Sequence, residues 1–301
     1  AVAKGNYQGP PLLSKPVQLR GRCAAMVALQ CGGGAAVAAV AAKAAAGAYG
    51  LSGMTLTGPC DGIVLPPTAQ AVVLTGKRLW LDQLQGRGVA VASGQLTLQD
   101  SVVARILPAA GAPAAIGVLV AGAKLAAQVV RIHAAVGRGI WLDDEGTAEL
   151  SAVRVDDVQS PGKAGSVGLS VTSGAAWATG LHVDGPHDMG IWVDGKGSFA
   201  TLRGAVVHSR FGPGPDRGLA GVAVDLGANA HMEGVAVYGR FESGIATDSG
   251  QVQGSGVVVA AEVTKGSDES TTCVAAHAAQ PTLREFALHG IDFSVRAGEV
   301  F

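Results

Sequence analysis

Apolar and polar residues alternate along most of this chain, in segments that begin with a glycine followed by an apolar residue. Each segment holds an alternating stretch, a glycine-containing turn, a second alternating stretch and a short third one, such as Val153–Val155 or Val235–Val237. A period of two places successive side chains on opposite faces of a β-strand. The pattern therefore predicts three short strands in every repeat. The segments open at Gly88, Gly117, Gly139, Gly168, Gly190, Gly221 and Gly244.

The spacing of these repeats predicts a solenoid. Successive opening glycines are separated by 29, 22, 29, 22, 31 and 23 residues. The short value is about one coil of three strands, and the long value is the same coil with a Pro- and Gly-rich loop after the third strand. A propeller blade would need about 40 residues of antiparallel strand, and the Leu/Asn ladder of a leucine-rich repeat is absent. We expect an all-β fold, a parallel β-helix whose coils of about 22 and about 29 residues alternate.

The same pattern sets the expected organisation of the chain. We expect a single domain with an N-terminal coil or cap over residues 1–34, regular coils over 35–263 and a C-terminal cap over 264–301, because solenoids usually carry terminal caps. The Ala-rich stretch Ala35–Ala48 has the composition of a helix. Because the alternating pattern resumes on both sides of it, we interpret it as a coil with small interior residues.

Composition fits a narrow core and excludes some functions. Apolar residues make up 48% of the chain and aromatic residues only 4%, so the interior must be filled by Ala, Val, Leu and Ile. The net charge is −1 and no basic stripe is present, which argues against nucleic acid as a partner. No apolar run reaches the roughly 18 residues of a transmembrane segment.

Three of the four cysteines, Cys23, Cys31 and Cys60, lie near the N-terminus, and the fourth is Cys273. They have neither a C-x-x-C pair nor a histidine at zinc spacing. One disulfide among the first three would suit an exported protein, whereas buried free thiols are the alternative.

Equivalent positions of a stacked repeat form columns, and one column is acidic. It lies four residues after the opening glycine and includes Asp143, Asp194, Asp225 and Asp248. Neighbouring carboxylates raise one another's pKa unless a cation or hydrogen-bond donors intervene. The column could therefore bind Ca²⁺, although no cofactor is required. The alternative, which we favour, is that each Asp accepts a hydrogen bond from the turn that follows it.

A second column carries Trp141 and Trp192, each in the string GIW. Strand alternation directs both side chains outward, and two coils of separation place them roughly 10 Å apart. That distance suits two sugar rings of one polysaccharide, so both are candidate substrate-binding residues. The alternative is that each Trp packs beneath a neighbouring long loop.

A third column follows the third strand and is rich in titratable residues. We expect it to contain Arg105, His133, Asp156, Asp184, His208 and Tyr238, beside the long loops. Carboxylates could bind a cation or act as a base, histidines could transfer protons, and arginine could neutralise a uronate. The alternative is a solvated edge of weak ion pairs. The candidate catalytic residues are Asp184, His187, Asp188, His208 and Arg210, and further candidate binding residues are His133, Asp156 and Tyr238.

The G-[VIL]-x-V strings, the Asp or Gly turns after them and the closing V-x-V strings resemble the right-handed parallel β-helix superfamily, the pectate-lyase-like fold. The resemblance covers about Val17 to Val263. The opening LLSKPVQLRGRC and the later GLSGMTLTG are similar to exported, often lipoprotein-type, β-helix repeat proteins of GC-rich bacteria. This resemblance implies a secreted or cell-surface protein, lipid-anchored in its full precursor. The catalytic motifs of pectate lyases and polygalacturonases are absent, so no catalytic residue is carried over.

The function expected from these observations is an exported binding or surface-scaffold protein that recognises a polysaccharide or a surface protein along the loop-bearing edge. The alternative is a polysaccharide-active enzyme, with a lyase favoured over a hydrolase, whose site lies at Asp184, His187 and His208. A second alternative is an adhesin or a tailspike-like fragment. That function would need a large apolar side face, which the columns do not show.

Overall fold

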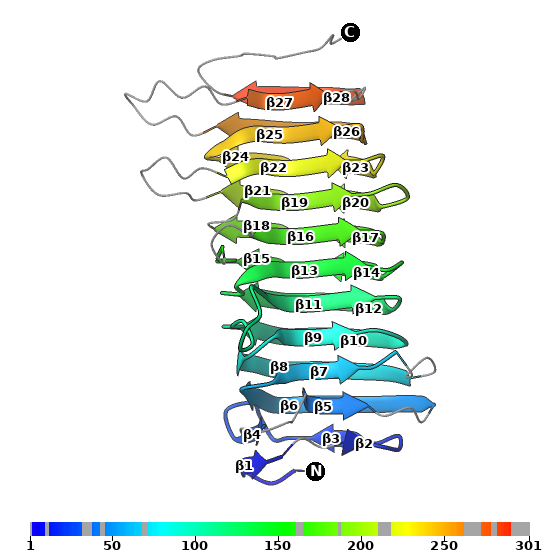
Figure 1. Ribbon diagram of the computed structural model, residues 1–301, viewed down its shortest axis with the longest axis vertical. Coiled ribbons are helices and arrows are strands. Elements are labelled where there is room, and N and C mark those ends of the chain that lie inside the picture. Colours follow the sequence, from blue (N-terminus) through cyan, green and yellow to red (C-terminus); the bar gives the residue numbers. More distant parts are fainter. Residues whose placement is uncertain are drawn as a thin grey trace.

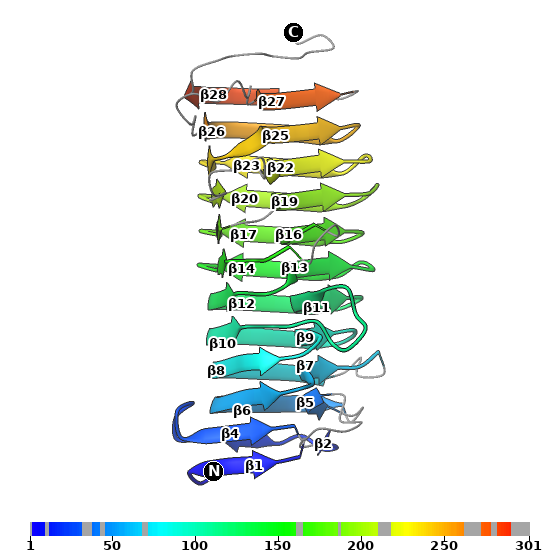
Figure 2. The same cartoon turned by 60° about the vertical axis from the view of Figure 1, so that its left-hand side comes forward.

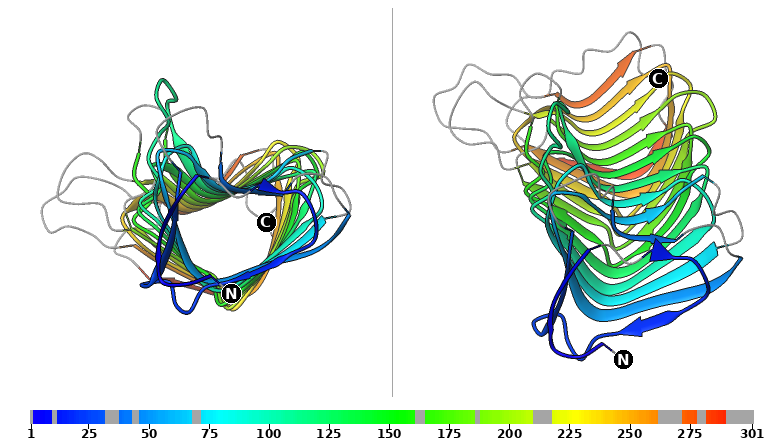
Figure 3. Two further views of the ribbon diagram at one scale, coloured as in Figure 1. Left: turned by 90° about the horizontal axis from the view of Figure 1, so that it is seen from below. Right: turned by 60° about the horizontal axis from the view of Figure 1, so that its bottom comes forward.

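The strands of this protein stack into a ladder in a computed structural model (Figure 1). No helix occurs in the part of the chain that the structure describes, and therefore none that could span a membrane. Seen along the long axis of the molecule, the coils lie over one another (Figure 3). The chain is a right-handed parallel β-helix, as the sequence predicts. The described residues are 2–9, 12–31, 38–42, 46–67, 72–160, 165–185, 188–209, 218–261, 272–277 and 282–289.

The first strand of every coil belongs to one parallel sheet of 11 strands. Its strands are β2 (Leu12–Leu13), β5 (Ala38–Ala42), β7 (Asp61–Leu65), β9 (Arg87–Val91), β11 (Ala115–Ala121), β13 (Gly137–Asp143), β16 (Val167–Thr172), β19 (Met189–Asp194), β22 (Gly218–Asp225), β25 (Phe241–Asp248) and β27 (Thr272–His277). Each strand pairs with its equivalent in the next coil, so backbone hydrogen bonds run along the helix axis.

The second and third strands of the coils form a sheet of 17 strands (Figure 2). Its strands are β1 (Gly5–Gln8), β3 (Gln18–Arg20), β4 (Val27–Gln30), β6 (Gly47–Gly58), β8 (Val72–Leu84), β10 (Gln95–Ala104), β12 (Lys124–His133), β14 (Thr147–Ser151), β15 (Arg154–Asp156), β17 (Ala175–Thr179), β18 (His182–Gly185), β20 (Phe199–Arg203), β21 (Val206–Ser209), β23 (Asn229–Glu233), β24 (Ala236–Gly239), β26 (Gln251–Ala261) and β28 (Thr282–His289). In coils such as that of β12, the second and third strands are one continuous strand.

A bend of left-handed backbone marks the corner between the second and third strands. The corner residue has a φ of 54° at Val129, 51° at Ala152 and 65° at Gly180. These residues stack in successive coils, where the Ala152 N–H donates to the Thr179 carbonyl and the Gly180 N–H to that of Arg203. The corner turns the outward face of the third strand away from that of the second. The two strands therefore present separate surfaces.

Strand register confirms the predicted repeat. The buried residues Val89, Val118, Ile140, Leu169, Ile191, Val222 and Ile245 are direct partners in consecutive coils of the first sheet. They keep a constant offset from the opening glycines, so the alternation of short and long coils is a property of the structure. Inward residues of all three strands form one continuous core of mostly Val, Leu, Ile and Ala.

The opening glycines lie where the first and third strands come closest. A Cβ at Gly139 would lie 2.6 Å from the Gly168 carbonyl oxygen and 2.4 Å from Val155 Cγ1. A Cβ at Gly168 would lie 2.6 Å from the Gly190 carbonyl oxygen and 2.3 Å from Val183 Cγ1. Real Cβ atoms essentially never approach other heavy atoms so closely. Glycine recurs here because no side chain fits between the stacked backbone and the interior valine.

The strand pairing reaches both ends of the described chain. The Ala-rich segment contributes β5, which pairs with β7, so the interpretation of this segment as a coil is confirmed for the described residues. At the other end, β27 pairs with β25 and β28 pairs with β26. Coil pairing therefore extends into the segment expected to form the C-terminal cap.

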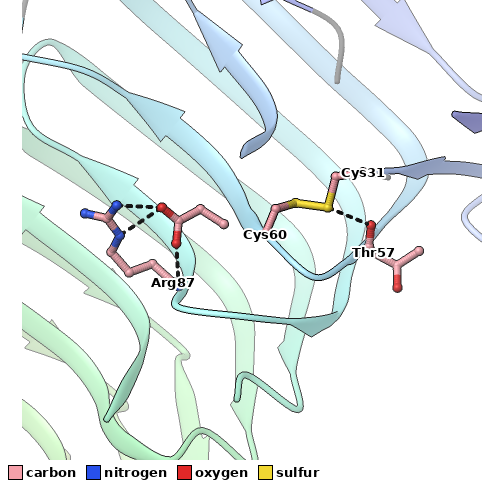
Figure 4. The surroundings of a disulfide bond; sticks show 5 residues. Cys31, Thr57, Cys60 and Arg87 are labelled. Atoms are coloured by element: carbon pink, nitrogen blue, oxygen red, sulfur yellow. Dashed lines mark hydrogen bonds and ion pairs between the residues drawn. A yellow bond between two sulfur atoms is a disulfide. The ribbon is translucent and has the colours of Figure 1, made fainter. Parts of the chain in front are cut away.

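A disulfide joins two neighbouring coils near the N-terminus. Cys31, directly after β4, is bonded to Cys60, directly before β7, and the two Cα atoms are 6.4 Å apart (Figure 4). Both residues are buried, and Cys23 is a free cysteine. The prediction of one disulfide among the first three cysteines is confirmed. Beside it, the Asp61 carboxylate accepts hydrogen bonds from the backbone N–H and the guanidinium of Arg87.

Candidate functional site

The third strands carry a row of titratable side chains on their outward face. In Figure 1, β15, β18, β21 and β24 lie one above another. Strand alternation puts the first and third residues of each strand on the same outward face, which brings the arginines beside the acids and histidines. We call this surface the titratable edge. It consists of Arg131, His133, Arg154, Asp156, His182, Asp184, His208 and Tyr238.

Asp156 lies at the centre of one half of the edge. Its side chain is only 5% exposed. The Arg131 guanidinium donates to both carboxylate oxygens, at 2.9 and 2.7 Å, and His133 Nδ1 lies 2.7 Å from one of them. Burial by itself would raise the pKa of Asp156, but the hydrogen bonds and charges of Arg131 and His133 outweigh it and lower that pKa. Asp156 is therefore a fixed anion that orients the exposed Arg131 and the half-buried His133.

Asp184 has the same kinds of partner in the next coils. Arg154 Nη2 donates to one of its carboxylate oxygens at 3.0 Å, and His208 Nδ1 lies 3.0 Å from the other. The His208 ring stacks on the Tyr238 ring, with centroids 4.3 Å apart and planes inclined by 22°. Arg154 also forms an ion pair with Asp156 at 3.3 Å. One network therefore connects β12, β15, β18, β21 and β24.

His133, Asp156 and the adjacent Asp157 could offer one metal ligand each, because their ligand atoms lie within 4.8 Å of one another. They form the one such group of three among the described residues. However, the Arg131 guanidinium already binds both oxygens of Asp156, and its charge neutralises the carboxylate that would attract a cation. The arrangement fits an ion-pair network better than a metal site.

The structure corrects one position of this column. Arg105 does not lie in it, because the strand partner of His133 is Ala104 and Arg105 is one residue further along. Arg105 instead makes a bidentate ion pair with Asp82, the strand partner of Ala104. The physical reason is that Arg105 follows the end of β10 in a left-handed conformation, with a φ of 52°. The paired Arg105 and Asp82 lie at the N-terminal end of the same edge.

The remaining candidate catalytic residues are not brought into this network by the described contacts. Asp188 precedes β19, where its carboxylate accepts hydrogen bonds from the N–H and hydroxyl of Ser166, at 2.5 and 3.1 Å. It thereby holds the end of the loop before β16. His187 and Arg210 lie outside the described residues. Sequence reasoning missed Arg131 and Arg154, although each lies two residues before a candidate in its strand.

In the acidic column, Asp194 and Asp225 are direct strand partners. Asp225 accepts hydrogen bonds from Trp192 Nε1 and from the Asp248 N–H, both at 3.1 Å. Burial, followed by repulsion from Asp194 and Asp248, raises the pKa of Asp225 despite these bonds. Asp143 is separated from the others by Thr172, whose hydroxyl lies 3.4 Å from its carboxylate. Ca²⁺ binding by this column stays a prediction.

Relieving the repulsion should stabilise the protein. The raised pKa of Asp225 means that folding disfavours its ionised form, so stability falls as the pH rises through the folded-state pKa. Asp194→Asn removes one repelling charge, and Asp194 Oδ1 has no hydrogen-bond partner among the described residues to lose. We expect the melting temperature to rise by about 1–2 °C at pH 7, and the gain to vanish near pH 3, where Asp225 is protonated.

The same thermal melts test the Ca²⁺ prediction. If Ca²⁺ binds the column, it should raise the wild-type melting temperature by mass action, and Asp194→Asn should lose that rise. A wild-type melting temperature that does not respond to Ca²⁺ or to a chelator would contradict binding. It would leave Asp225 as a hydrogen-bond acceptor for the Asp248 N–H of the next coil.

Trp141 and Trp192 lie on the outward face of the first strands, with Ser170 between them in register. The Arg138 guanidinium lies over both rings, 4.0 Å from the Trp141 centroid and 5.8 Å from that of Trp192. Trp141 Nε1 donates to the Thr172 hydroxyl at 2.6 Å. Burial lowers the pKa of Arg138, against the attraction of Asp143. A stacked sugar would have to share these rings with Arg138, so sugar binding here stays a prediction.

No family model and no curated protein matches the sequence. The likeness to solved structures covers nearly the whole chain. The A-module of Azotobacter vinelandii mannuronan C-5 epimerase AlgE6 aligns with a TM-score of 0.63 and 16% identity, covering 96% of this chain and 86% of that module. The AlgE4 A-module aligns with a TM-score of 0.57 and 13% identity, over 98% and 87%.

Tailspike protein 3 of bacteriophage CBA120 aligns with a TM-score of 0.52 and 10% identity, covering 97% of this chain and 56% of the tailspike. The chain has the pectate-lyase-like right-handed parallel β-helix fold. At these identities the likeness extends to the fold alone. The chemistry of this protein must therefore be argued from its own side chains.

Proposed function

We propose that this protein is an exported polysaccharide-binding protein that holds an acidic, uronate-containing polymer along the titratable edge. The observation that carries the proposal is the placement of Arg131 and Arg154 over buried carboxylates, with side chains still 50% and 43% exposed. A guanidinium has five N–H donors. In Arg131, the Nε–H and one N–H of Nη2 donate to Asp156. The remaining donors are not used by Asp156, and guanidinium donors suit a ligand carboxylate.

The geometry of the coils supports a polymeric ligand. Neighbouring strands are about 4.8 Å apart along the axis, close to the length of one pyranose unit in an extended polysaccharide. The buried acids fix the orientation of the exposed groups before binding, which reduces the entropy cost of association. The Cys31–Cys60 disulfide is typical of an oxidising, extracytoplasmic compartment. Two of the structural neighbours are named as enzymes that act on mannuronan, a uronate polymer.

Arg131→Ala should weaken binding of polymannuronate oligomers about tenfold, because it removes a charge-assisted hydrogen-bond donor. Lys124→Ala is the matched control, since it removes an exposed cation from the second-strand part of the same β12 strand. Isothermal titration calorimetry of the three proteins gives the comparison. Equal affinities for all three, or no binding of the oligomers by the wild type, would contradict the proposal.

Arg131→Ala leaves Asp156 without its main partner, so stability must be monitored beside affinity. Arg154→Gln provides a second variant, because Gln can still donate a hydrogen bond to Asp184 while the cation is lost. Both variants should melt cooperatively under the conditions of the titration. Weaker binding by both, with unchanged binding by Lys124→Ala, supports recognition at the titratable edge.

A second candidate function is catalysis at the same edge, favoured by the Asp184–His208–Tyr238 arrangement. A buried carboxylate that orients an imidazole, with a phenol stacked beside it, provides groups for proton transfer. The reaction would begin with removal of the C5 proton of a uronate, while Arg154 neutralises the sugar carboxylate. A lyase would then break the bond to O4, and an epimerase would return a proton to the opposite face.

One assay separates binding from catalysis. Polymannuronate incubated with the protein in D₂O would acquire deuterium at C5 if the proton is removed and returned, or unsaturated ends if the chain is cleaved. His208→Gln should abolish either product. If NMR spectra show neither product with the wild type, the protein binds without catalysis.

A further inference from the structure

A second surface lies on the outward face of the second strands, around the corner from the titratable edge. It is a depression of about 500 Å³ that crosses β10, β12, β14 and β17, which lie side by side in Figure 2. None of the titratable-edge residues lines it. Its lining is Thr97, Gln99, Ala126, Ala127, Gln128, Glu149, Leu150, Ser151, Trp177 and Thr179.

The depression arises from one small residue in an outward column. Thr97, Ala126, Glu149 and Trp177 are consecutive strand partners, and the alanine leaves space between its larger neighbours. The inward residues Leu125 and Ala148 of the same strands fill the core, so strand alternation fixes which side chains face the depression. The hollow is therefore built into rigid, hydrogen-bonded strands.

Trp177 forms one end of the depression. Trp177 is 45% exposed, although burial of an indole would stabilise the fold. The ring is supported by Phe199 in the next coil, with centroids 6.5 Å apart and planes inclined by 56°. This contact restricts the ring before any ligand binds, so the entropy cost of using it as a platform is low. The electron-rich face of an indole attracts the weakly positive C–H groups on the face of a pyranose.

The other polar side chains of the depression are uncharged, except for one carboxylate. Gln99, Gln128, Ser151 and Thr179 offer both donors and acceptors, which match sugar hydroxyls. Glu149 lies beside Trp177 in register, and no cation is among the lining residues. An anionic sugar would meet Glu149 without a compensating charge, whereas a neutral sugar can donate hydroxyl hydrogen bonds to it.

From these observations we infer that the depression is a binding site for a neutral oligosaccharide, distinct from the acidic-polymer site of the titratable edge. Trp177 stacks on one sugar ring, and the glutamines, Ser151 and Thr179 hydrogen-bond to its neighbours. Four strands span roughly 14 Å along the axis, which accommodates about three pyranose units lying parallel to the axis. A chain in this direction meets equivalent side chains in successive coils.

The test is calorimetric titration with three neutral probes, cellohexaose, mannohexaose and xylohexaose. Trp177→Ala should weaken binding of the recognised hexasaccharide at least about tenfold, because the stacking platform is lost. Ala126→Leu should weaken it similarly by filling the depression while leaving Trp177 in place. Trp80→Ala is the matched control, since Trp80 is also a half-exposed tryptophan, at 46%, but lies in a third-strand position. This control should bind as the wild type does.

Binding of neutral hexasaccharides and binding of polymannuronate can be tested independently of one another. Loss of hexasaccharide binding in Trp177→Ala and Ala126→Leu, with polymannuronate binding unchanged, supports a separate neutral-sugar site. Equal affinity in all four proteins would overturn the inference, and so would absence of binding to all three probes by the wild type at millimolar concentration. Since Ala126→Leu keeps every polar group of the depression, its result does not depend on how well Trp177→Ala folds.

Discussion

Removing the Cys31–Cys60 disulfide should lower the free energy of unfolding by about 3–4 kcal/mol, because the bond closes a loop with a sequence separation of 29 residues in the unfolded chain. The double variant Cys31→Ala/Cys60→Ala avoids burying new polar groups at two buried positions. Denaturant unfolding under non-reducing conditions gives the comparison with the wild type. The midpoint should shift without loss of the solenoid.

The free Cys23 supplies the control for this prediction. Cys23→Ala should unfold like the wild type, because its thiol is not bonded. A reducing agent should lower the stability of the wild type toward that of the double variant and leave the double variant unchanged. A wild type that is equally stable in its oxidised and reduced forms would be inconsistent with a stabilising bond.

Gly168→Ala should lower the free energy of unfolding by about 3 kcal/mol, which is at the upper end of the usual cost of adding a methyl group to a packed core. The added methyl group would lie 2.3 Å from Val183 Cγ1 and 2.6 Å from the Gly190 carbonyl oxygen. The valine can shift only by disturbing the core, and the carbonyl belongs to a strand paired on both sides. Chemical denaturation followed by circular dichroism measures the loss.

Gly204→Ala is the control, because Gly204 has open space around it and a left-handed backbone. A Cβ there would meet no atom within 4 Å, so the expected cost of about 1 kcal/mol comes from its φ of 56° alone. Adding Val183→Ala to Gly168→Ala should recover part of the loss, because it removes one of the two clashing atoms. If the two glycine variants were equally destabilised, the close approach of the strands would not explain the repeat.

The sequence was sufficient to predict the architecture because each coil repeats the same physical requirements. Alternation identified the strands, and the opening glycines fixed the offset that the partners Ile140, Leu169 and Ile191 follow in the structure. The reason for the glycine was not predictable, since the approach of Val155 or Val183 depends on how the coil closes.

The candidate site was only partly predictable, because the repeat gives the register of the strands but not the contacts made where each coil closes. Register between neighbouring strands brought His133, Asp156, Asp184, His208 and Tyr238 together, as the repeat indicated. The position of Arg105 was wrong because Ala104 is the strand partner of His133, and Arg105 itself belongs to the left-handed turn that follows the third strand. The depression beside Trp177 depends on the volume of side chains in four separate coils, which no local pattern reveals.

The ion-pair network spans five strands whose separation is set by backbone hydrogen bonds, not by the side chains themselves. The side chains of the titratable edge therefore lie at fixed intervals of about 4.8 Å along the helix axis. A ligand that contacts several coils cannot draw them closer together or push them apart. The repeat length of the ligand must match the spacing of neighbouring coils, or the ligand can bind at only one coil. For the polymer ligand proposed above, selection at this surface would therefore depend on repeat length as well as on charge.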